Sequence, residues 1–226
     1  MLLKQDFFKL EPGEKGAVVN KLIAYSSPSY NFFLMFLLSI VITTLGLLVS
    51  SPTVVIGGML IAPVLYPILS LSMGVVTANF KLIKRSCLLL LEVIIFSVIL
   101  AFIISLFITN KSINFEILTR TRPSMIYFFI AFVSGIAASY ALSKPKLSEV
   151  LPGVAIAVSV LPPLAVCGIA LAFFEWSMAV GAFSLFFLNI IGIIFASIIV
   201  FSLLGFYEKR RQIDRKIEIE ERIEEK

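Results

Sequence analysis

Few residues in this sequence could carry out chemistry, and their placement limits what that chemistry is. The chain contains no His, the residue used most often for acid–base catalysis and zinc ligation. Asp6 and Asp214 lie near the two ends of the sequence, while Cys87 and Cys167 lie singly within apolar stretches. We therefore expect no catalytic residues, no metal site, no cofactor and no enzymatic activity.

One carboxylate, Glu92, lies within a long apolar stretch. A charged side chain inside a bilayer costs at least a few kcal/mol, so such residues are candidates for function. In one interpretation, Glu92 faces the interior of a helix bundle and takes up a proton or cation that is coupled to solute movement. In the other, it reaches toward the interface or pairs with Lys84 or Arg85. Asn189 is the similarly placed polar residue in the second half of the chain.

Prolines interrupt two other apolar stretches near their middles. Pro63 and Pro67 interrupt the first, and Pro162 and Pro163 interrupt the second. A proline lacks an amide N–H and clashes with the carbonyl one turn earlier, so each pair predicts two half-helices around a break. The unpaired backbone groups of a break cannot face lipid, so they must be buried in protein or line a cavity. The alternative is that the prolines are ordinary kinks.

Small or polar residues surround the two breaks and could leave room for a solute. With the prolines and Asn189 they make up our candidate site for a substrate or ion: Gly57, Gly58, Ala62, Pro63, Tyr66, Pro67, Ser159, Leu161, Pro162, Pro163 and Asn189.

The composition indicates that these residues are positioned by membrane-spanning helices. Hydrophobic residues make up 59% of the chain and charged residues only 15%, against about 25% charged residues in soluble domains. Together with a mean hydropathy of +1.04, these values predict an integral membrane protein. Glu92 is the only charged residue in the six apolar stretches that we predict as spans. They are residues 31–50, 54–78, 86–109, 125–142, 150–174 and 177–206.

The two halves of the apolar region match at an offset of 99 residues, which places Pro63 on Pro162. Each half contains three spans, and an odd number of crossings turns the second half upside down relative to the first. We therefore predict an all-α polytopic membrane protein with two inverted three-span repeats, residues 31–109 and 125–206, each with a Pro-broken middle helix. As an alternative, segments 54–78 and 150–174 are re-entrant hairpins that do not cross.

Basic residues predict the orientation in the membrane. Of the 19 Lys and Arg residues, Lys111, Arg120 and Arg122 fall in loop 110–124, and the other sixteen fall in segments on the opposite side. By the positive-inside rule, both termini are cytoplasmic. We expect a multi-pass protein of the cell membrane with a cytoplasmic N-terminal segment (1–30), a transmembrane domain (31–206) and a charged cytoplasmic tail (207–226). Residues 16–25 form either a short surface helix or a plain connector.

The partners that we expect follow from this topology. The basic segments would contact anionic lipid headgroups on the cytoplasmic side. Nothing in the sequence supplies the continuous basic face that a nucleic acid needs. Stripes of small residues fit helix packing within one chain as well as a homo-oligomer.

Three stretches resemble a known family. They are LGLLVSSPTVVIGGMLIAPVLYPIL (45–69), LPGVAIAVSVLPPLAVCGIALA (151–172) and LFFLNIIGI (185–193). With their IGxMLIxP and PGVAIAxxxxPPLA motifs, they resemble a large prokaryotic family of uncharacterised hydrophobic membrane proteins that is known only as a domain of unknown function. The resemblance implies membership of a membrane-protein family and brings no settled activity.

Three classes of function stay open at this level. A transporter or permease would move a small solute or ion past the broken helices, and paired broken helices favour it by architectural analogy. An ion channel would need a polar lining, for which only Glu92, Asn189 and scattered Ser and Thr are available. A scaffold, a lipid-translocating protein or a stress sensor would use the same helices without carrying a solute.

Overall fold

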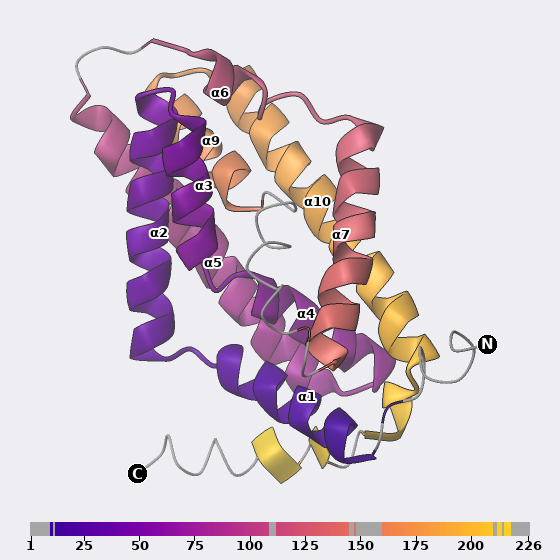
Figure 1. Cartoon of the computed structure of the whole chain (residues 1–226). Helices are drawn as coiled ribbons and strands as arrows, with labels where there is room; N and C mark the ends of the chain where they lie inside the picture. The colour runs from indigo at the N-terminus through magenta and orange to yellow at the C-terminus, as the bar shows by residue number, and fades with distance from the viewer. Residues whose placement is uncertain are drawn as a thin grey trace.

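Every regular element that the structure describes is helical. The computed structural model, drawn in Figure 1, describes residues 10, 12–108, 112–144, 147, 160–209, 212–213 and 215–217. Its helices are α1 (Pro12–Tyr25), α2 (Tyr30–Leu48), α3 (Pro52–Ile61), α4 (Leu65–Val76), α5 (Phe80–Leu106), α6 (Phe115–Leu118), α7 (Met125–Ser143), α9 (Leu161–Ala172), α10 (Trp176–Leu203) and the 3-10 turn η2 (Phe206–Lys209).

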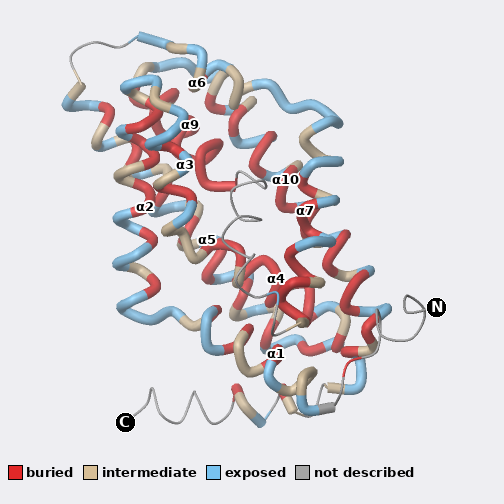
Figure 2. Tube along the Cα trace, in the orientation of Figure 1, coloured by how far each residue is buried: buried red, intermediate tan, exposed pale blue. Residues whose placement is uncertain are grey.

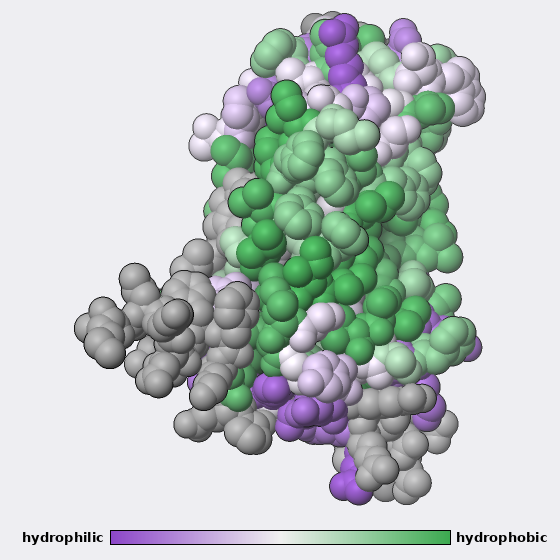
Figure 3. Space-filling model, turned by 90° about the vertical axis from the view of Figure 1, so that its right-hand side faces the viewer, coloured by the Kyte–Doolittle hydropathy of each residue, from purple (hydrophilic) through white to green (hydrophobic). Residues whose placement is uncertain are grey.

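Four helices are long and apolar enough to cross a membrane: α2, α5, α7 and α10. A fifth span results if α3 and α4 count together, because they are separated by three residues and bent by 51°. On the face drawn in Figure 3, apolar residues form a belt across the middle of the molecule, and hydrophilic residues gather at its two ends. The described part of the chain therefore has the architecture of an integral membrane protein.

The first, third, fourth and sixth predicted spans correspond to α2, α5, α7 and α10 and differ from them at their boundaries, while the second corresponds to the bent pair α3–α4. The largest difference is at α5, which begins at Phe80, six residues before the predicted residue 86. Asn79 explains this start, because its side chain accepts a hydrogen bond of 2.9 Å from the amide of Leu82 and so caps the helix. The basic residues that follow are carried on the first turns of α5, where long side chains reach the interface. Ser29 and Ser124 cap α2 and α7 in the same way.

The second predicted break falls mostly outside the described residues. Residues 148–159 are not described, so the structure gives only α9, the helix that follows them. The prediction of a discontinuous helix in 150–174 therefore stays a prediction.

The short helices α4 and α9 lie inside the bundle. Figure 2 shows both as largely buried, while α2 and α7 expose one side. Helix α4 packs against α5 and α10, and α9 packs against the same two helices. In addition, α9 contacts α2 and α3. The core is thus built around two 12-residue helices that are held between the two longest ones.

Three connections of three residues each share one geometry. The residues at their centres, Ser50, Ala78 and Phe174, have φ values of 54°, 48° and 62°. In each connection, the third residue donates its amide hydrogen bond to the carbonyl five residues earlier, as Asn79 does to Gly74 at 2.9 Å. This is the Schellman arrangement that ends a helix and reverses the chain. It makes tight hairpins of α2–α3, α4–α5 and α9–α10.

The two ends of the bundle differ in what covers them. At one end, α1 contacts α4, α7 and η2, and Lys15 donates a hydrogen bond of 3.1 Å to the carbonyl of Gly205. The buried side chains of α1 face the bundle: Val18, Val19, Leu22 and Ile23. Residues 16–25 are therefore helical, as the first interpretation predicted. At the other end, α6 packs on the end of α2, where Asn114 donates to the carbonyl of Leu47 at 2.6 Å.

The helix boundaries correct the offset that we derived from the prolines. Helices α4 and α9 have 12 residues each and begin 96 residues apart, and α5 and α10 also begin 96 residues apart. At this offset Pro67, not Pro63, matches Pro163, and both are the third residue of their helix. Pro63 lies in the break before α4. The offset of 99 was wrong because it aligned identical letters that occupy different positions relative to a helix start.

Candidate functional site

The break between α3 and α4 consists of Ala62, Pro63 and Val64. Ala62 has an extended backbone (φ −67°, ψ 120°), which ends α3. Neither the start of α4 nor the start of α9 has a side chain that caps it. No side chain therefore accepts a hydrogen bond from the amide groups in the first turn of α4. Their hydrogen-bond partners must be backbone carbonyls or a molecule beside the helix.

A cavity of about 310 Å³ reaches this break from the elbow between α1 and α2. It is large enough for a small solute, since such sites begin at about 300 Å³. Its lining mixes polar and apolar side chains: Ala24, Tyr25, Ser29, Asn31, Phe32, Met35, Ile61 and Pro63. We refer to it as the elbow cavity.

Polar groups come to the elbow cavity from the chain reversal between α1 and α2. Ser29 accepts a hydrogen bond of 3.2 Å from the amide of Phe32, so its side chain is fixed by capping α2. Tyr25 stacks on Tyr66, with ring centroids 4.8 Å apart. This contact joins the elbow to the first turn of α4, and it gives the candidate residue Tyr66 a defined partner.

The two neighbouring glycines of α3 differ in their surroundings. A Cβ atom at Gly58 would collide with the hydroxyl of Thr43, and the carbonyl of Gly58 accepts a hydrogen bond of 2.6 Å from Ser39. Gly58 therefore serves the close packing of α2 on α3. A Cβ atom at Gly57 would meet nothing within 4 Å. Gly57 is therefore not required for the packing of α3, and it does not line the elbow cavity.

The candidate residues of the second half do not line the elbow cavity. Leu161, Pro162 and Pro163 are buried in the first turn of α9, and Asn189 is 3% exposed within α10. Ser159 lies outside the described residues. The structure thus brings Pro63 and Tyr66 together with the α1–α2 elbow, whereas the second group of residues is packed in the core.

Glu92 lies close to the middle of α5 and is partly exposed. Its neighbours one turn away, Leu88, Ile95 and Phe96, are all exposed and apolar. The side chain therefore stands on the outer side of the bundle, in the apolar belt. It makes no hydrogen bond or ion pair with the residues that the structure describes. Neither the inward-facing arrangement nor the pairing with Lys84 or Arg85 is present.

Buried hydroxyl groups fall into two classes. Ser72 donates to the carbonyl of Ile68 at 3.0 Å, which is the ordinary local bond of a serine in a helix. By contrast, the hydroxyls of Ser70, Ser86 and Ser97 are buried without a hydrogen-bond partner among the described residues. Within that same part of the chain, no group of three or more His, Cys, Asp or Glu is placed to hold a metal ion.

Sequence reasoning missed Tyr25, Ser29 and Asn31. The signal for them was present, because they are polar residues at the junction of a predicted surface helix (16–25) and the first predicted span (31–50). Their position beside Pro63 depends on how the elbow folds back on α3, which no local pattern specifies.

The sequence profile of a family described as a domain of unknown function, DUF389, matches residues 59–195, more than half of the chain. The chain belongs to this family. The DUF389 region begins at Met59 in α3 and includes the break, α4, α5 and α9. Of the residues that line the elbow cavity, only Ile61 and Pro63 fall within it. The resemblance that the three sequence stretches indicated is thereby confirmed.

A curated relative of this DUF389 protein is similar over most of the chain. It is an uncharacterised protein of Methanocaldococcus jannaschii, 32% identical over 172 residues, which are 76% of this chain and 53% of that protein. The chain therefore spans about half the length of that relative. No solved structure matches the chain.

Proposed function

We propose that this protein is a transporter or permease that moves a small solute or ion past the break between α3 and α4. The observation that carries the proposal is the elbow cavity, which brings polar side chains to Pro63 inside an otherwise apolar bundle. Backbone groups in a break are tolerated at membrane depth where they line such a cavity.

The paired packing of the two halves supports an inverted repeat. Helix α4 lies against α5 of its own half and α10 of the other, while α9 lies against α10 of its own half and α5 of the other. The hairpins α4–α5 and α9–α10 have the same connection length and the same backbone reversal. Transporters built from inverted repeats place their sites at the broken helices, where one half moves against the other.

The orientation that we propose puts α1 and η2 on the cytoplasmic side of the cell membrane. Basic residues gather at that end of the bundle, on α1, at the start of α5, at the end of α7 and in η2. They are Lys15, Lys21, Lys81, Lys84, Arg85, Lys144 and Lys209. The α6 end carries Arg120 and Arg122. This asymmetry follows the positive-inside rule, and the elbow cavity then opens toward the cytoplasm.

Cysteine labelling tests whether the elbow cavity is accessible to water. In a chain with Cys87 and Cys167 replaced by Ser, we expect Asn31→Cys and Ile61→Cys to react with a membrane-impermeant thiol reagent that is added from the cytoplasmic side. The matched control is Val133→Cys, on the outer face of α7 and 63% exposed to lipid. If the cavity positions react no faster than Val133→Cys, the cavity is dry and the site at Pro63 is wrong.

A flux screen in proteoliposomes, with and without a proton gradient, tests transport itself. Once a transported solute is found, Asn31→Trp should fill the cavity and block flux, and Pro63→Ala should impair flux by allowing a more continuous helix. The variants must reconstitute as well as the parent protein. Full flux in both would place the pathway elsewhere in the bundle.

A further inference from the structure

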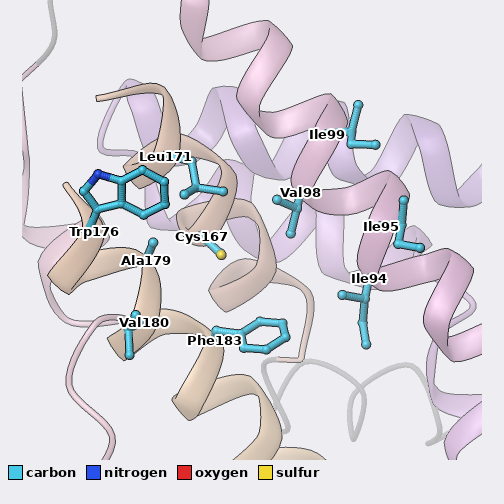
Figure 4. A pocket seen from close by; sticks show the side chains of 10 residues that line it. All are labelled: Ile94, Ile95, Val98, Ile99, Cys167, Leu171, Trp176, Ala179, Val180 and Phe183. Carbon is cyan, nitrogen blue, oxygen red and sulfur yellow. The ribbon is translucent and has the colours of Figure 1, made fainter. Parts of the chain in front are cut away.

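A second cavity lies between α5, α9 and α10 and shares no lining residue with the elbow cavity. It is an apolar groove of about 440 Å³. In Figure 4, Cys167 and Leu171 of α9 form its floor, while α5 and α10 form its walls. Every lining side chain is apolar or aromatic: Ile94, Ile95, Val98, Ile99, Cys167, Leu171, Trp176, Ala179, Val180 and Phe183. A groove of this volume accommodates an organic molecule of ordinary ligand size.

One charge lies next to this groove. Glu92 precedes the wall residue Ile95 by three positions on α5, and residues with this spacing are neighbours on a helix surface. It is the only acidic residue in helices α2, α3, α4, α5, α7, α9 and α10. Because it has no partner among the described residues and lies in the apolar belt, an ionised carboxylate there requires a cation from outside the bundle.

We propose that the groove binds a hydrophobic organic cation from the membrane, with Glu92 as its counter-ion. The apolar walls take the hydrocarbon or aromatic body of the ligand. The rings of Trp176 and Phe183 on α10 offer faces that attract positive charge. An acyl chain of a lipid would fill the groove equally well but would leave the carboxylate of Glu92 unpaired. The charge of Glu92 therefore favours a cation as the occupant. The inference is independent of transport at the elbow cavity.

Two probes of one shape and opposite charge test this inference. Purified protein in nanodiscs of zwitterionic lipid is titrated with tetraphenylphosphonium and, separately, with tetraphenylborate. We expect the binding that the protein adds over protein-free nanodiscs to be at least about tenfold tighter for the cation than for the anion, since the two probes have one shape and opposite charge. Glu92→Gln should remove that preference. Glu175→Gln, which alters an exposed carboxylate beside Trp176 but outside the apolar belt, should leave it unchanged.

Groove filling tests the place of binding. Val180→Trp adds an indole to a groove wall at a residue that is 65% exposed, and Val133→Trp adds the same group at a residue that is 63% exposed on α7, outside the groove. We expect Val180→Trp to weaken binding of the phosphonium at least about tenfold, and Val133→Trp to have no effect.

Each other outcome overturns the proposal. Equal affinity for both probes in the parent protein would mean that a neutral chain such as a lipid tail occupies the groove. If Glu175→Gln abolished binding of the phosphonium and Glu92→Gln did not, the counter-ion would be Glu175 at the membrane interface. A change from oligomer to monomer in Glu92→Gln, measured by light scattering, would show that a second copy of the chain covers this face of α5.

Discussion

Helices α4 and α9 have the same length and both pack against α5 and α10, yet the rest of their surroundings differs. All ten residues of α9 from Leu161 to Ala170 are buried, and Gly168 allows the backbone of α5 to approach closely. The corresponding position in α4, 96 residues earlier, is Ser72. The start of α4 lies beside the elbow cavity, whereas the first turn of α9 is packed in the core.

The two short helices thus hold similar places between α5 and α10 but differ in what lies beside them. The first turn of α9 is closely packed, and space on the α9 side is confined to the apolar groove at Cys167 and Leu171. The α4 side keeps space and polar groups beside a break. A structure with two equivalent breaks would predict two equivalent sites, so variants that act on one side only test whether the two sides differ.

The largest effect is expected from a side chain added at Gly168. A Cβ atom there would lie 2.5 Å from the carbonyl oxygen of Val98 and 2.7 Å from Cβ of Ala101. Gly168→Val should therefore destabilise the protein by roughly 3 kcal/mol through overpacking. The control is Gly57→Val in α3, where a Cβ atom meets nothing within 4 Å. Denaturant titration in detergent measures both, and equal losses would contradict the proposed contrast.

Thiol reactivity should differ between the two sides by roughly tenfold or more, because only a solvated thiol forms the reactive thiolate easily. Ile61→Cys, at the elbow cavity, is compared with the native Cys167, which is 7% exposed on the floor of the apolar groove. The rate constants for reaction with a charged thiol reagent, measured in native membranes, give the ratio of reactivity between the two thiols. A faster reaction at Cys167 would mean that water enters on the α9 side instead.

A smaller difference is expected between the outer helices of the two halves. Ser139 of α7 shares a hydrogen bond of 2.8 Å with Ser197 of α10. Thr44 of α2, 95 residues earlier, bonds only to the carbonyl of Ile40 in its own helix. Ser139→Ala should cost about 0.6 kcal/mol, the average for such bonds between membrane helices, and Thr44→Val should be close to neutral. Unfolding midpoints measure both, and equal costs would remove this asymmetry.

The smallest effect concerns the two matching hairpin turns. Ala78 and Phe174 both hold positive φ values, which cost an L-residue more than a glycine. Replacing either by Gly should stabilise the protein by about 0.5 kcal/mol, after the entropy of glycine is subtracted. Thermal unfolding of both variants measures the gain. Similar gains would indicate that the turns are equivalent, even though the helices that they join have different surroundings.

Most of the fold could be predicted from hydropathy, because long apolar stretches have few other uses. The start of α5 could not, since Lys81, Lys84 and Arg85 were counted as a loop although charged residues extend a helix into the interface. The register of the two halves was also missed. Proline is tolerated both in a break and in the first turn of a helix, so Pro63 and Pro162 share a residue type without sharing a position.

Solute binding by the candidate residues stays a prediction. Of these residues, Pro63 lines the elbow cavity, and Tyr66 stacks on Tyr25, which also lines it. Pro162, Pro163 and Asn189 lie in the core instead, and no local pattern distinguishes a proline that lines space from one that is packed. The position of Glu92 on the outer side of α5 depends on the rotation of that helix in the bundle, which packing against α4 and α9 decides.

The tight hairpins also determine how this chain can enter a bilayer during synthesis. Helices α4 and α9 each extend for about 18 Å, which is well short of a hydrocarbon core of about 30 Å. Each is joined by three residues to a helix that is long enough to span, α5 or α10. We therefore expect each short helix to enter the bilayer together with the long helix that follows it, since neither α4 nor α9 is long enough to cross alone.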